Sequence, residues 1–214
     1  LFRSWYHFAI AVMLFMITNL IMNIKYDYKT VILAFTGLES IGNSSWYIIA
    51  ILVMYIATYG TFKLLKTESN LKKIIVVAVL CGIYICIFWK IKNDNPWYYN
   101  TVAAYPLGMF YAQYKNKIEA IVWKNNYVYL ALSGIFLCIF IFGYHYGNNL
   151  VVYQLLSMVF VLLLVLLTMK ITFKNEILEF LGKYTFEIYI LQRIPMIIFK
   201  DVVSSEYIYF SVCL

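Results

Sequence analysis

The hydrophobic and polar positions of this chain fall into long separate blocks. Between Lys124 and Lys170 the chain runs for 45 residues without one Asp, Glu, Lys or Arg, and a polar turn at residues 143–149 divides that stretch into two apolar runs. A helix needs about 20 mostly apolar residues to cross a bilayer. The pattern therefore predicts a transmembrane helical hairpin over residues 127–142 and 150–169.

Other charge-poor runs repeat this pattern along the rest of the chain. They are too long and too continuously apolar for the alternating strands of a membrane barrel. The sequence therefore predicts an all-α, polytopic transmembrane helical bundle with about seven complete helices and a truncated last one. The predicted crossings are residues 4–24, 46–65, 74–89, 101–114, 127–142, 150–169 and 184–199, followed by the start of another at 207–214.

The domain organisation is predicted to be simple. No internal repeat, low-complexity tract or Pro/Gly-rich linker is present, so residues 1–214 are expected to form a single membrane-embedded domain. We expect it to be incomplete at both ends, because Leu1 leads straight into an apolar segment and residues 207–214 supply only about two helical turns. The longest connection, residues 25–45, contains a short apolar run at 30–35, expected at the membrane interface or folded back into the bundle.

Composition agrees with lipid as the solvent. The chain is 64% hydrophobic and 13% charged, whereas soluble domains carry about 25% charged residues. Its Tyr, Phe and Trp residues suit aromatic belts at both membrane surfaces. The net charge of +7 comes from short lysine clusters between apolar runs, where topology and anionic headgroups explain it, so no nucleic-acid partner is expected. The cysteines lack metal-ligand spacing and are expected to be small buried hydrophobes, with no metal site.

The basic residues predict the orientation of the chain. Eleven lie in one set of alternate connections and at most six in the other. Since Lys and Arg are enriched in cytoplasmic loops, residue 1 is expected to start on the cytoplasmic side of a cell membrane and residues 25–45 to face out. The larger set is Arg3, Lys63, Lys66, Lys72, Lys73, Lys115, Lys117, Lys124, Lys170, Lys174 and Lys183.

Ionisable side chains inside the predicted crossings are few, and at membrane depth such groups often mark function. Glu187 lies in the cytoplasmic half of the 184–199 crossing and Arg193 near its outer end. Pro195 is expected to kink this helix and free a carbonyl one turn back. The alternative is structural: an acid at a helix end and an Arg that reaches the interface along its own stem.

His7 is the candidate catalytic residue that the sequence offers, one turn inside the first crossing. No acidic residue lies three or four positions away to orient it, so an interfacial or packing role is the favoured interpretation. Asn19, Asn23 and Gln154 are interpreted as interhelical hydrogen-bonding residues. No nucleophile elbow, P-loop, dinucleotide fingerprint or HExxH motif is present.

Three segments in order carry a resemblance. Residues 42–50, GNSSWYIIA, are similar to an N-x-x-W-[FY]-[IL] motif at the start of a helix. Residues 104–109, AYPLGM, are similar to F-P-L-G-[MI], and residues 181–192, LGKYTFEIYILQ, to L-G-K-x-S-[FY]-x-[IL]-Y-[LI]-L-H. Together they resemble the acyltransferase 3 family of integral-membrane O-acyltransferases.

The resemblance implies a ten-helix bundle with both termini in the cytoplasm, of which this chain would supply helices three to ten. The family's proposed catalytic His lies on the first helix, so the base is expected before Leu1 and the fragment alone is expected to be inactive. Gln192 stands where many members have His, and an amide cannot shuttle protons. Arg3 is the candidate for holding an acyl-CoA phosphate, the alternative being a positive-inside anchor.

The implied reaction moves an acyl group, usually acetyl, from cytoplasmic acyl-CoA to a hydroxyl of a cell-surface or lipid-linked glycan, as in bacterial polysaccharide O-acetylation. Acyl-CoA is then a co-substrate, and no permanently bound cofactor is expected. An alternative is a transporter or flippase of lipid-linked glycan precursors, which broken helices in two corresponding halves would favour. A structural or assembly subunit is a third. The predicted walls of the substrate passage are Trp46, Tyr47, Glu187, Tyr189, Gln192 and Arg193.

Overall fold

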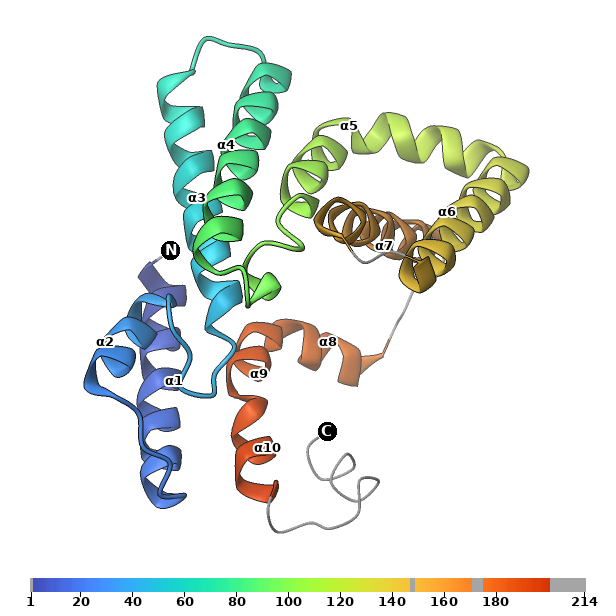
Figure 1. The fold of residues 1–214 in the computed structure, drawn as a ribbon. Coiled ribbons are helices and arrows are strands. Elements are labelled where there is room, and N and C mark those ends of the chain that lie inside the picture. The colour runs from blue at the N-terminus through green and yellow to red at the C-terminus, as the bar shows by residue number, and fades with distance from the viewer. Residues whose placement is uncertain (1, 147–148, 171–174, 201–214) are drawn as a thin grey trace. The chain divides into compact units, whose positions relative to one another are not determined.

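The computed structural model describes residues 2–146, 149–170 and 175–200, apart from the side chains of residues 2–4 and 123. Every regular element in these ranges is helical, which confirms the predicted all-α fold (Figure 1). The elements are α1 (Phe2–Ile21), α2 (Tyr28–Thr36), α3 (Ser45–Leu64), α4 (Asn70–Ile91), the 3-10 helix η1 (Pro96–Tyr98), α5 (Ala104–Lys124), α6 (Asn126–Tyr146), α7 (Leu150–Lys170), α8 (Glu176–Lys183), α9 (Thr185–Leu191) and α10 (Arg193–Phe199).

Each complete predicted crossing coincides with helix. Within the described residues, α3, α4, α6 and α7 are long and apolar enough to cross a membrane, and the apolar part of α1, Trp5–Ile21, is shorter. At the predicted 101–114 crossing the structure has the helix α5, which begins at Ala104 and continues to Lys124 through Lys, Glu and Ala, which favour helix; α5 is not among the described helices that are long and apolar enough to cross a membrane. The start of another crossing at 207–214 lies outside the described residues.

The predicted 184–199 crossing is divided at Gln192 into α9 and α10. Gln192 keeps right-handed helical angles, φ −55 and ψ −23. Pro195 has no amide hydrogen to donate to the carbonyl of Leu191, one turn back. The chain therefore stays helical through this region with an interrupted hydrogen-bond ladder, as the position of Pro195 predicts.

The described residues fall into two compact units, one from residues 2–52 and 175–200 and one from residues 53–146 and 149–170. In the first unit, α1 packs against α2, α9 and α10. The short run at 30–35 forms α2 and folds back onto the core, which confirms one of its two expected placements. The core consists of Phe8, Ala11, Val12, Phe15, Ala34, Ile41, Ile48 and Ile190.

In the second unit α4 packs against α5, α5 also contacts α6 and α7, and the most extensive contact joins α6 to α7. Gly143 on α6 lies so close to α7 that a Cβ at this position would come within 2.5 Å of Leu156 Cδ2. Small residues allow this close approach of helices in lipid, where packing rather than water exclusion drives association. The two helices of the predicted 127–169 hairpin therefore approach each other closely at Gly143.

Two sequence interpretations need correction. Cys81 is buried as predicted, but Cys86 and Cys138 are exposed, because their helix faces point away from the protein; Cys213 lies outside the described residues. Asn19 donates Nδ2 to the carbonyl of Ile41 at 2.8 Å, and Gln154 bonds to the Ala103 amide and the Tyr99 carbonyl. Both amides thus bond to a connection rather than to another helix.

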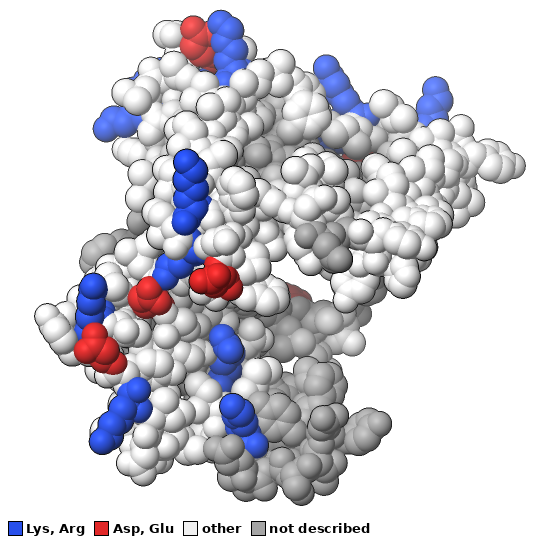
Figure 2. Space-filling model, viewed as in Figure 1, with Lys and Arg blue, Asp and Glu red and all other residues white. Residues whose placement is uncertain are grey.

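The surface is largely uncharged. Figure 2 shows a face on which Lys, Arg, Asp and Glu stand in small separate patches and other side chains cover the rest. No residue of α6 is buried, and Leu130, Ile139 and Phe142 on this helix are exposed. In water so wide an apolar surface would mark an interaction site. Lipid is the solvent that this surface fits.

Candidate functional site

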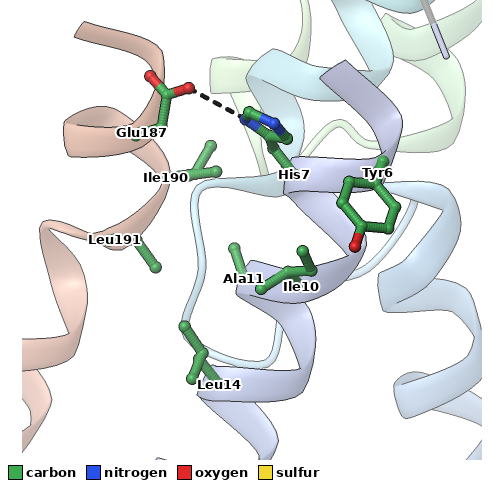
Figure 3. Close-up of a pocket in the computed structure, with 8 residues that line it drawn as sticks. All are labelled: Tyr6, His7, Ile10, Ala11, Leu14, Glu187, Ile190 and Leu191. Carbon is green, nitrogen blue, oxygen red and sulfur yellow. Dashed lines mark hydrogen bonds and ion pairs between the residues drawn. The ribbon is translucent and has the colours of Figure 1, made fainter. Parts of the chain in front are cut away.

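The first unit brings His7 and Glu187 together from positions 180 residues apart. His7 Nδ1 on α1 lies 3.0 Å from Glu187 Oε1 on α9 (Figure 3). The two side chains are 29% and 36% exposed. With the proton on Nδ1, the imidazole donates to the carboxylate and leaves the Nε2 lone pair open. This arrangement can accept a proton from a nearby hydroxyl.

A cavity of about 240 Å³ lies beside this pair. In Figure 3 the His7 and Glu187 side chains lie at one end, and Leu14 lies at the other. The polar pair is thus next to a wall that is mostly aliphatic. The lining residues are Tyr6, His7, Ile10, Ala11, Leu14, Glu187, Ile190 and Leu191.

Helical spacing positions these side chains. On α1, His7, Ala11 and Leu14 follow the i, i+4, i+7 spacing of one helix face. On α9, Glu187, Ile190 and Leu191 follow the i, i+3, i+4 spacing. Ala11 and Ile190 are buried members of the core, so the packing that joins α1 to α9 also holds the two polar groups within reach of each other.

Three predicted passage residues form an aromatic cluster in the same unit. The Tyr47 and Tyr189 ring centroids are 4.9 Å apart at 62°, and those of Trp46 and Tyr189 are 6.2 Å apart at 86°. Such edge-to-face contacts are a favoured aromatic geometry. The Tyr189 hydroxyl lies near the Ser44 side chain but makes no hydrogen bond to any described residue.

The predicted passage residues do not all meet at one place. Glu187 lines the cavity, whereas Trp46, Tyr47 and Tyr189 do not. Gln192 and Arg193 are exposed and also do not line it. Arg3 belongs to α1, but its side chain lies outside the described part of the chain, so its predicted contact with a phosphate stays a prediction.

No acidic residue lies three or four positions from His7, as the sequence shows; the acidic residue that faces it in the structure, Glu187, comes from a distant helix. Sequence reasoning also missed Tyr6, Ile10 and Leu14 as cavity residues. The i, i+4, i+7 spacing from His7 along α1 could have indicated part of this face. No local signal could have indicated that α9 lies against it.

One comparison with known proteins supports the resemblance that the motifs carry. The family model described as an acyltransferase domain matches residues 2–214. No curated protein and no solved structure gives a significant match. The family match covers every described helix, including those that carry His7 and Glu187. Together with four helices in the described ranges that are long and apolar enough to cross a membrane, it identifies this chain as a multi-pass membrane protein that belongs to the acyltransferase 3 family.

Proposed function

We propose that this protein transfers an acyl group, in the simplest case acetyl, from acyl-CoA to a hydroxyl of a cell-surface or lipid-linked glycan. The observation that carries the proposal is the His7–Glu187 pair at the end of an apolar cavity. An acyl transfer needs a base beside a place where the acyl group can lie out of water. The pair and the aliphatic wall supply these two requirements.

In the proposed step, the glycan hydroxyl attacks the thioester carbonyl of acyl-CoA while Nε2 of His7 accepts the hydroxyl proton. A carbon–oxygen bond forms and the carbon–sulfur bond breaks. The thiolate of CoA then takes the proton from the imidazolium. The Glu187 carboxylate holds the ring through Nδ1 and stabilises the imidazolium, the role that an acid plays behind a catalytic His in other acyl transfers.

The resemblance places the family's own catalytic His on a helix that precedes the counterpart of α1. Two roles for His7 and Glu187 therefore have to be distinguished by experiment. In the first, His7 itself removes the hydroxyl proton. In the second, the pair positions a substrate whose proton another His removes. Acyl-CoA is a co-substrate in both cases, and Arg3 is the candidate ligand for its phosphates.

The experiment uses the full-length protein in vesicles with radiolabelled acetyl-CoA and a glycan acceptor. We expect label to appear on the glycan in amounts that follow the protein concentration. A flippase would move a lipid-linked glycan across the vesicle without labelling it, and a structural subunit would do neither. If the acceptor crosses the bilayer but stays unlabelled, the result contradicts acyl transfer and favours a flippase. Vesicles without protein give the background.

The predicted orientation has its own test, because the donor and the acceptor are expected on opposite sides. In a chain whose native cysteines are replaced by Ala, we expect Asn93→Cys to react with an impermeant maleimide in intact cells. Glu68→Cys, in the turn between α3 and α4, should react only after permeabilisation, because the lysines of this turn favour the cytoplasm. The opposite labelling pattern would reverse the orientation.

A further inference from the structure

The connection between α4 and α5, which contains η1, is held in place by side chains from two helices. Tyr84 of α4 donates its hydroxyl to the Tyr98 carbonyl at 3.1 Å. Gln154 of α7 accepts from the Ala103 amide at 3.2 Å and donates to the Tyr99 carbonyl. The Gln154 side chain therefore bonds to both ends of the segment 99–103, which follows η1. The backbone of the connection is thus held in place without a ligand.

Aromatic packing also holds this connection in place. Phe88 stacks on Tyr84 with ring centroids 4.3 Å apart and on Tyr98 with centroids 5.9 Å apart. Lys92 Nζ lies 5.5 Å from the centroid of the Tyr98 ring, a favourable cation–π position. Tyr98 and Tyr99 are buried. The connection therefore turns two of its three consecutive aromatic residues inward.

Trp97, the residue before these two, is not buried with them and is 65% exposed. It follows Pro96, whose ring fixes φ, inside η1. Asn93, Asp94 and Asn95 immediately before them are exposed. The side chains of these three residues make no hydrogen bond within the described ranges, so they are available to a ligand.

We propose that Trp97 together with residues 93–95 forms a docking platform for a pyranose ring of the acceptor glycan. An indole presents a flat apolar face and an N–H donor, which suits a sugar ring that has C–H groups on one face and hydroxyls at its edge. The Asp94 carboxylate accepts from sugar hydroxyls, and the neighbouring amides donate and accept. This inference rests on the proposed function, in which a glycan receives the acyl group, and on the predicted outer placement of this connection.

The competing explanation is that Trp97 is a membrane-interface anchor, since Trp is enriched at that level. Trp89 near the C-terminal end of α4 offers a control, because it is 48% exposed and lies shortly before the connection that carries Trp97. Its chain neighbours are Phe88 and Lys90, not amides and a carboxylate. An anchor would make the two tryptophans equivalent, whereas a sugar platform makes only Trp97 important.

The test is binding of soluble β-linked N-acetylglucosamine, galactose and mannose oligosaccharides to the purified full-length protein in nanodiscs, followed by saturation-transfer NMR. We expect at least one oligosaccharide to bind. Trp97→Ala should weaken its binding about tenfold and Asp94→Ala should weaken it as well, while Trp97→Phe should retain part of it. Trp89→Ala should leave it unchanged. The exposed position of Trp97 means that its removal opens no core cavity.

Two results would overturn the platform. One is that none of these oligosaccharides binds the wild-type protein, and the other is that Trp89→Ala and Trp97→Ala weaken binding equally. Failure of the acyltransferase proposal is distinguishable from both, because sugar binding would persist through Trp97 while no label moved from acetyl-CoA to glycan.

Discussion

Glu187→Gln is expected to lower the rate of acyl transfer by about 10²- to 10⁴-fold, the usual range for loss of acid–base assistance. The substitution keeps the size of the side chain but removes the negative charge that faces His7 Nδ1 at 3.0 Å. The imidazolium formed during the reaction then loses its stabilising partner. Initial rates of label transfer in vesicles measure the loss, with His7→Ala expected to fall in the same range.

The double variant decides whether the two residues act as a unit. Groups that depend on each other show strongly non-additive effects, so His7→Ala combined with Glu187→Gln should be about as slow as either single variant. Glu176→Gln is the control, because Glu176 lies in the same unit on α8 and does not line the cavity. Losses that multiply in the double variant would contradict a joint role.

The pH dependence of kcat separates the two roles of the pair. If His7 is the base, His7→Ala loses the acidic limb of the wild-type pH–rate profile. If the pair only positions the substrate, His7→Ala lowers the rate and keeps the limb, because another His then supplies it. The comparison requires that His7→Ala and Glu187→Gln keep the helix content of the wild-type protein, which circular dichroism measures.

The helices could be predicted from the sequence because lipid demands long uninterrupted apolar runs. The run from Leu150 to Lys170 appears in the structure as one helix, and the 74–89 run lies within α4. The end of α5 could not be predicted this way, because the helix continues beyond residue 114 into a polar segment that ends at Lys124. α8 was missed for the same reason: its eight residues are too few for a crossing, and Glu176, Glu179 and Lys183 interrupt its apolar positions.

The candidate site was only partly predictable, because its chemistry depends on which helices touch. The scarcity of charge indicated Glu187, and the motif at 181–192 placed Tyr189 beside it in sequence. The structure shows that Glu187 turns toward His7 while Tyr189 packs on Tyr47. Neighbouring positions on one short helix thus serve two separate groupings, which residue types and spacing alone do not resolve.

Phe15→Ala is expected to destabilise the first unit by about 2 kcal/mol. Phe15 is a fully buried member of the core, and its ring lies 3.7 Å from where a Cβ would stand on Gly42, so it packs under the connection before α3. The loss of stability has two contributions, the transfer of the side chain between solvents and the cavity left behind. In lipid the transfer contribution is small, because the surroundings of the unfolded helix are as apolar as the core. The cavity part remains, and at ~24 cal/mol per Å³ a void of roughly 100 Å³ gives this value.

Met13→Ala is the matched control for that substitution. Met13 lies on the same helix but is exposed, so lipid can fill the space that its side chain leaves and little stability should be lost. Unfolding titrations in mixed detergent micelles compare the two variants with the wild-type protein. Because Phe15 also belongs to the packing that joins α1 to α9, its loss should lower acyl transfer at temperatures where the wild-type protein is still folded. Equal stability of the two variants would mean that the core around Phe15 does not hold His7 against Glu187.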